Sequence, residues 1–310
     1  MSDLLLRAEL EKLAVTLNTS VAELDFLAHR DVQALRELRA ATSAALFDRH
    51  VKRFQRLADS TKLLPNKLVA VITSKVIPPA LSAQVTGLLD ADDAVDLAGR
   101  LELSYLADIC VAMDPRRAQP VLQAMPSATV VEVAMEMLRR RDFMPMARFV
   151  DALTNAQISA VAQRMTAEGL LQVGFFVESD ERLSQLIGLL DDEQLAGTMP
   201  AAAAQDGQLW PQVLSLVERL DATQRARLGN LLSSATPELL DSLNKALFER
   251  DLWRASLPML EAMDDAAQEI VVAALASHAD QAGEPDHLDA FLQSLSDGLR
   301  RKVQIALGRV

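Results

Sequence analysis

The amino-acid sequence predicts an all-α protein in which short helices stack into an α-solenoid. The 310 residues include only 11 Gly and 12 Pro, and no apolar run alternates with the period of two expected for a half-buried strand. Half of the residues are apolar but only 4% are aromatic, a composition that suits close packing of helices. One short helical phrase also recurs along the chain, which indicates a repeat architecture.

The recurring phrase is an apolar pair, a polar residue and then an amphipathic helical run. It is clearest in LLDADDAVDLAGRL, which begins at Leu88, and in AMDPRRAQPVLQAM, which ends at Met125. The polar residue suits the N-cap position, because its side-chain oxygen accepts a backbone N–H that has no partner in the first helical turn. We therefore predict that helices begin after Asp90, Asp114, Thr154, Asp191, Asp221 and Asp264.

Residues 1–60 are predicted to form an N-terminal helical region. A helix over Leu4–Leu17 and another after Ser20 should pair as a hairpin, and Glu23 stands at the capping-box spacing from Ser20. Helix-turn-helix DNA-binding proteins share this layout. Here, however, the second helix offers acids and no Arg or Lys, which disfavours contact with phosphates.

A long helix is predicted next, from Val32 to about Ala58, because this segment contains no Gly or Pro. Near its end the apolar residues share one side and the basic residues share the other, since steps of three, four and seven residues return to one side of a helix. The basic face consists of Arg49, Lys52, Arg53 and Arg56. It is either a solvated surface or a docking surface for an acidic partner, including the acidic body of a second copy in a homodimer. A membrane surface or nucleic acid is the remaining interpretation.

The charge is distributed unevenly along the chain, whose net charge is −12. Residues 30–75 carry +6, whereas residues 1–29 carry −3 and residues 76–310 carry −15. An acidic body repels nucleic acid and anionic lipid, so either partner would have to bind residues 30–75. Nucleic acid is therefore a disfavoured partner.

Residues 61–310 are predicted to form the repeat solenoid. A helix over Asn66–Val76 comes first, Pro78 and Pro79 interrupt the chain, and three-helix units then follow with a period of about 40 residues. One unit appears shortened around Ala201–Gly207. The predicted helices of the units span 103–113, 115–125, 128–141, 143–153, 155–165, 167–177, 210–220, 222–232, 237–250, 253–263 and 266–277, with a closing segment over 287–307.

The sequence shows no reaction centre. Cys110 is the only cysteine and lies in an apolar run, so we expect a buried inert thiol and a reducing compartment. Phosphate-binding, dinucleotide-binding and nucleophile-elbow motifs are absent. The best candidate for a transition-metal site is better explained as a solvated loop; it comprises His278, Asp280, Glu284, Asp286 and His287. We therefore predict a protein that is not an enzyme and has no cofactor.

No apolar run approaches the roughly 20 residues needed to cross a bilayer. Arg7 and Glu9 interrupt the apolar start of the chain too early for a signal peptide. We therefore expect a cytoplasmic protein without a transmembrane segment.

Acidic residues gather at one predicted helix start, at Asp90, Asp92, Asp93 and Asp96. Acids stabilise any first helical turn through the helix dipole, which gives these residues a purely structural explanation. Carboxylates are also ligands for Mg²⁺, which often binds through only one or two of them. Weak Mg²⁺ binding at these four residues is the alternative.

The phrases LLDADDAVDLAGRL and AMDPRRAQPVLQAM resemble the intracellular N-terminal domain of MgtE-type magnesium transporters. The resemblance covers about Leu88 to Met125, with weaker similarity to about Leu275. It implies a right-handed superhelix of short helices, and it offers the four aspartates from Asp90 to Asp96 as Mg²⁺-sensing residues. The transporter's membrane channel has no counterpart in this sequence. Armadillo and HEAT repeats are similar in general character and are equally open.

These observations favour a non-enzymatic scaffold or adaptor that binds a protein or peptide on the concave face of the solenoid, because stacked helices present long surfaces. A Mg²⁺-responsive regulatory domain is the alternative. A nucleic-acid-associated regulator that binds through residues 30–75 is the third possibility.

Overall fold

The computed structural model describes residues 2–61, 63–250, 252–282 and 291–307. All regular secondary structure in these ranges is helical, without a strand, which confirms the all-α prediction. Within the same ranges, no helix combines the length and apolarity needed to cross a membrane. The chain divides into two compact units, Met1–Arg164 and Met165–Val310. The boundary predicted near residue 60 lies inside the first unit.

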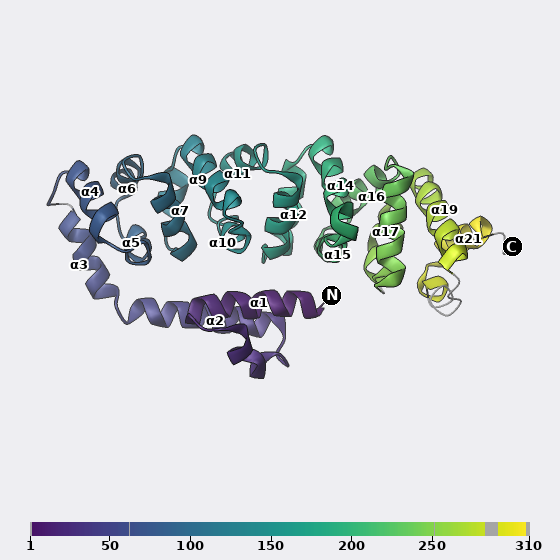
Figure 1. Cartoon of the computed structure of the whole chain (residues 1–310), viewed down its shortest axis with the longest axis horizontal. Helices are drawn as coiled ribbons and strands as arrows, with labels where there is room; N and C mark the ends of the chain where they lie inside the picture. The colour runs from purple at the N-terminus through teal and green to yellow at the C-terminus, as the bar shows by residue number, and fades with distance from the viewer. Residues whose placement is uncertain (1, 62, 251, 283–290, 308–310) are drawn as a thin grey trace. The chain divides into compact units, whose positions relative to one another are not determined.

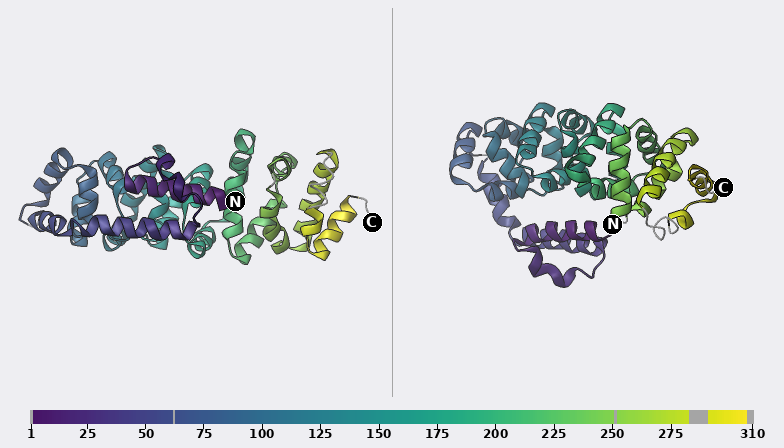
Figure 2. Two further views of the ribbon diagram at one scale, coloured as in Figure 1. Left: turned by 90° about the horizontal axis from the view of Figure 1, so that it is seen from below. Right: turned by 45° about the vertical axis from the view of Figure 1, so that its right-hand side comes forward.

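The first unit begins with α1 (Ser2–Leu17), the 3₁₀ helix η1 (Val21–Leu27) and α2 (Val32–Asp48). Helices α1 and α2 lie side by side in Figures 1 and 2 and pack against each other. Their shared interior consists of Leu10, Leu13, Ala14, Leu24 and Leu35.

The segment after Ser20 is a seven-residue 3₁₀ helix and not the predicted α-helix. Asn18 adopts a positive φ of 53° and ends α1. The Glu23 carboxylate then accepts hydrogen bonds from the Ser20 backbone N–H at 3.3 Å and from the Thr19 hydroxyl. A short 3₁₀ helix lacks the length and pitch of an α-helix that reads a major groove, so the structure gives no support to a DNA-reading role.

The predicted single helix from Val32 to Ala58 is wrong at residues 49–50, where α2 ends and α3 (Val51–Thr61) begins. The His50 backbone N–H donates to the carbonyl of Phe47 at 2.9 Å, which closes a turn. Phe47 is buried beneath Arg117, whose guanidinium carbon lies 3.8 Å from the ring centroid. The ring of Phe54 lies 5.5 Å from that of Phe47. The break therefore coincides with tertiary packing around Phe47.

The remaining helices of the first unit form two adjacent rows (Figure 1). In one row α3, α5, α7, α9 and α11 pack in succession, and in the other α4 packs on α6 and α6 on α8. Their bounds are α4 (Asn66–Val76), α5 (Pro79–Thr86), α6 (Ala91–Ala98), α7 (Leu103–Ala112), α8 (Gln119–Ala124), α9 (Ser127–Arg139), α10 (Phe143–Arg148) and α11 (Asn155–Ala162).

The second unit is also a series of packed helices. Helix α12 packs on α14, α14 on α16 and α17, α16 on α18 and α19, and α19 on α21. Their bounds are α12 (Ala167–Phe176), α13 (Asp180–Leu189), α14 (Asp192–Gly207), α15 (Trp210–Arg219), α16 (Ala222–Leu232), α17 (Pro237–Glu249), α18 (Trp253–Ala262), α19 (Asp265–Ala282) and α21 (Asp297–Ala306).

Several predicted helix bounds need correction. Helix α8 begins at Gln119 and not at Pro115, because the Asp114 carboxylate accepts the Arg116 N–H at 3.2 Å and holds a turn. Helix α10 ends at Arg148, five residues early. Helix α13 was not predicted. The shortening that the sequence predicts around Ala201–Gly207 falls within α14, where residues 204–206 have non-helical backbone angles. Residues 287–290 of the predicted closing segment lie outside the described residues.

Four predicted caps are confirmed as side-chain caps. Thr154, Asp191, Asp221 and Asp264 each accept the backbone N–H three residues ahead, at 3.3, 2.7, 2.8 and 2.8 Å. Asp90 occupies the N-cap position of α6. The predicted capping role is therefore confirmed for these four residues, whereas Asp90 forms no side-chain cap hydrogen bond and Asp114 does not cap a helix, since the N-cap of α8 is Ala118.

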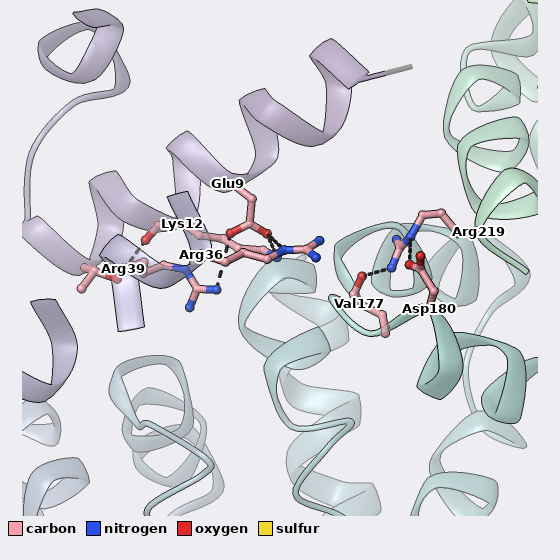
Figure 3. A network of polar contacts seen from close by, with 8 residues as sticks. Glu9, Lys12, Arg36, Arg39, Val177, Asp180 and Arg219 are labelled. Carbon is pink, nitrogen blue, oxygen red and sulfur yellow. Dashed lines mark hydrogen bonds and ion pairs between the residues drawn. The ribbon is translucent and has the colours of Figure 1, made fainter. Parts of the chain in front are cut away.

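Neighbouring repeats are also joined by long side chains that donate to carbonyls at earlier helix ends. Arg148 donates to the Met113 carbonyl at 2.7 Å, 35 residues away. Arg219 donates to the Val177 carbonyl at 2.6 Å, 42 residues away, and to Asp180 at 2.7 Å (Figure 3). These separations bracket the predicted period of about 40 residues. Each contact satisfies a carbonyl without a helical partner and places a positive charge at the negative end of a helix dipole.

Acid should weaken a pair of ionic contacts at the end of α9. Glu136 accepts hydrogen bonds from Arg139 and Arg140 at 2.7 Å, and Arg140 also binds Asp108 of α7 at 2.6 Å. The two arginine hydrogen bonds lower the pKa of Glu136 from 4.5 to about 2. Because the unfolded chain takes up the proton first, this stabilisation is complete above the unfolded pKa and is lost as the pH falls through the folded pKa.

We expect an NMR titration of the Glu136 side chain to give a midpoint near pH 2. In an Arg139→Gln/Arg140→Gln variant the midpoint should return towards the ordinary value for Glu. A wild-type midpoint already at that ordinary value would contradict the described contacts.

Candidate interaction surface

The predicted basic face lies on the surface of the first unit. Helix α3 buries its other side, where Ala58 is fully buried and Phe54 is half-buried, and it packs on α5. Lys52, Arg53 and Arg56 lie on the opposite side of α3 and are exposed, and Arg49, which ends α2, is also exposed. The amphipathic pattern is therefore as predicted for Lys52, Arg53 and Arg56, but the break at residues 49–50 removes Arg49 from this helix.

These four cations differ from most other arginines of the chain. Arg100, Arg140 and Arg227 all bind carboxylates at 2.6–2.7 Å. In the part of the chain that the structure describes, the side chains of the basic face form no ion pair and no hydrogen bond. Their charge is consequently available to a partner.

The structure also shows an exposed apolar stripe on α4, whose residues are not among the predicted site residues. Its residues recur at steps of three and four and so share one side of the helix. They are Leu68, Val71, Ile72 and Val76 of α4, preceded by Leu64 just before the helix, with exposed fractions from 37% for Ile72 to 73% for Val76. The opposite side of α4 packs through Val69 and Ala70 against Leu97 of α6.

The sequence signal for this stripe is the apolar run LVAVI at residues 68–72, whose five residues cover every side of one helical turn. A turn that is apolar all round is normally buried on all sides. In the structure only one side is covered, because α4 stands first in its row and packs on α6. Sequence reasoning predicted this helix but not its exposure.

The charge of this surface is mainly positive, with Asp59 at the end of α3 as an exposed acid. The 30 residues between Asp59 and Asp90 contain no Asp or Glu, although the chain has 43 such residues. Lys67 and Lys75 are exposed on α4. Helices α3 and α4 follow each other in the chain and each begins a row. We use the name α3–α4 end surface for the basic face, the apolar stripe, Lys67 and Lys75 taken together.

The candidate Mg²⁺ ligands Asp90, Asp92, Asp93 and Asp96 lie along α6 and its N-cap. Asp96 binds Arg100 at 2.7 Å and the Asn66 amide at 2.9 Å, and these hydrogen bonds lower its pKa. Among the described residues, no three His, Cys, Asp or Glu side chains are grouped so that they could hold a metal ion. The structure therefore does not assemble the four aspartates into a site.

The sequence also offers two other residue groups as candidate reactive or metal sites. Cys110 is half-buried on α7, and loss of water around its sulfur raises the pKa of the thiol to about 12. The thiol is therefore protonated at neutral pH and is not an activated nucleophile. The loop cluster around His278 and His287 lies outside the residues whose side chains the structure describes.

No protein-family model matches the sequence, and no curated protein is significantly similar to it. The resemblance to MgtE-type transporters, and the general one to HEAT and armadillo repeats, therefore stay predictions that depend on the quoted phrases.

Proposed function

We propose that this protein is a non-enzymatic scaffold or adaptor that binds a protein or peptide partner. In this proposal the packed helices are those of a right-handed α-solenoid of the HEAT or armadillo type. A solenoid usually presents its concave face to partners. The single observation that supports partner binding in this chain is the α3–α4 end surface, which combines exposed cations without ion pairs, on α3 and just before it, with an exposed apolar stripe on α4.

The composition of the surface is that of an interface. Apolar side chains supply the binding energy at the centre of an interface, while charged residues at the rim supply orientation and a faster encounter. Scattered exposed aliphatic residues are normal, but a contiguous group on one helix marks an interaction site. No observation on the described residues favours the Mg²⁺-responsive alternative.

Charge reversal of the basic face tests this function. We expect the variant Arg49→Glu/Lys52→Glu/Arg53→Glu/Arg56→Glu to lose at least about tenfold in partner retention, because complementary charge becomes repulsive. The measurement is affinity capture with the tagged full chain, quantified by mass spectrometry at about 50 and 500 mM salt, a range that spans strong and weak screening. Retention by the wild-type chain should fall as the salt rises.

The control reverses three exposed cations elsewhere, Arg164, Lys245 and Arg301, and should leave retention unchanged. Sedimentation of the same variants shows whether the partner is a second copy of this chain. The proposal fails if the wild-type chain retains no partner, or if both variants retain the same partners equally.

A further inference from the structure

We propose that the α3–α4 end surface binds an acidic amphipathic helix of a partner protein, which lies along α4 as the next member of its row. This inference rests on the proposed function and specifies the chemistry of the partner.

The geometry of α4 is suited to a helix. Within α4 the apolar stripe runs from Leu68 to Val76 at helical steps, a length of about 12 Å at 1.5 Å per residue. On its covered side α4 already accepts α6, through Val69 and Ala70 against Leu89, Leu97 and Leu101. A row grows by adding one helix beside another, with side chains of one helix in the grooves of its neighbour. The exposed stripe offers the same kind of surface to a helix that the first unit does not itself supply.

The charge determines which helix is accepted. Lys67 and Lys75 border or interrupt the stripe, and the basic face adds three cations on the preceding helix α3 and a fourth, Arg49, at the end of α2. No acid occurs in the 30 residues between Asp59 and Asp90. A partner helix with Asp or Glu beside its apolar side gains ion pairs here, whereas a basic helix meets mainly like charge, with Asp59 of α3 as the exception.

Other occupants fit this surface less well. A second copy that used the same surface in a two-fold dimer would place two cationic surfaces against each other. An anionic membrane is also attracted by Lys and Arg, but helices that lie in a membrane interface use Trp and Phe beside Leu. Residues 60–89 contain no aromatic residue at all.

The test uses fluorescence anisotropy with the full-length chain and a labelled synthetic helix. The acidic probe carries Leu at steps of three and four and Glu at the flanking positions. One control probe has the same composition in an order that breaks the steps, and a second replaces every Glu with Lys. We expect saturable binding of the acidic probe and at least tenfold weaker binding of both controls.

Matched protein variants locate the binding. Leu68→Asp and Val71→Asp should each weaken binding of the acidic probe at least about tenfold, as expected for residues at the centre of an interface. Leu103→Asp is the control, because Leu103 is exposed to a similar extent on α7, and it should bind like the wild type. Circular dichroism of each variant verifies that its helices are intact.

Several outcomes would overturn the inference. These are no saturable binding of the acidic probe, equal binding of the Lys probe, or equal losses for Leu68→Asp and Leu103→Asp. Preferential binding of phosphatidylglycerol vesicles through Leu68 would assign the surface to a membrane, and dimerisation lost in Leu68→Asp would assign it to a second copy. If partners captured by the wild-type chain are also captured by Leu68→Asp, the scaffold function stands and only this inference fails.

Discussion

Replacement of Glu9 by Leu should destabilise the α1–α2 pair by about 3–5 kcal/mol, the cost of removing one member of a buried ionic group. Glu9 is only 2% exposed. Its carboxylate lies 2.8 Å from the Lys12 ammonium, 3.3 Å from Arg36 and 3.4 Å from Arg39 (Figure 3). Without the carboxylate, a buried lysine and two partly buried arginines would lose the anion that they share.

Glu11→Leu is the control for this prediction. Glu11 is 37% exposed and lies 3.6 Å from Arg7, so its removal should change the free energy of unfolding by less than about 1 kcal/mol. The measurement is urea unfolding, with hydrogen exchange of α1 and α2 to locate the loss. Glu9→Leu/Lys12→Met should recover part of it, because the double variant also removes a buried charge. Equal effects of the Glu9 and Glu11 replacements would refute the buried ionic group.

Gly87→Ala should destabilise the first unit by about 1–3 kcal/mol, the usual cost of overpacking. A Cβ at this position would lie 2.6 Å from the carbonyl oxygen and 2.9 Å from the carbonyl carbon of Arg117. These are backbone atoms and cannot rotate away as a flexible side chain can. A shift of Arg117 would also disturb the cation–π contact that covers Phe47.

Gly99→Ala provides a matched comparison. Gly99 ends α6 as Gly87 ends α5, and both have negative φ, −63° and −71°. The nearest atoms to an added Cβ at Gly99 are 3.7 Å away. This variant should therefore be neutral or up to about 1 kcal/mol more stable, because Ala restricts the unfolded chain. Thermal unfolding of both variants distinguishes the two sites, and equal melting temperatures would show that the close approach at Gly87 is not significant.

The sequence by itself determined the parts of this protein that depend on neighbours within one or two helical turns. The helix bounds of α4 and α16, the side-chain caps at Thr154, Asp191 and Asp221, and the amphipathic character of α3 are all of this kind. A cap joins residues three apart, and a helical face repeats at steps of three and four. Such relations can be read directly from the order of the residues.

Only the tertiary structure decided what covers each helix. It broke the long basic helix at residues 49–50, beside the packing of Phe47 under Arg117. It placed Arg117 against Gly87, and it left the apolar stripe of α4 exposed at the start of a row. These outcomes depend on residues that are distant in sequence. The periodicity of one helix shows that a face is apolar, but only the position of the neighbouring helices determines whether that face is buried.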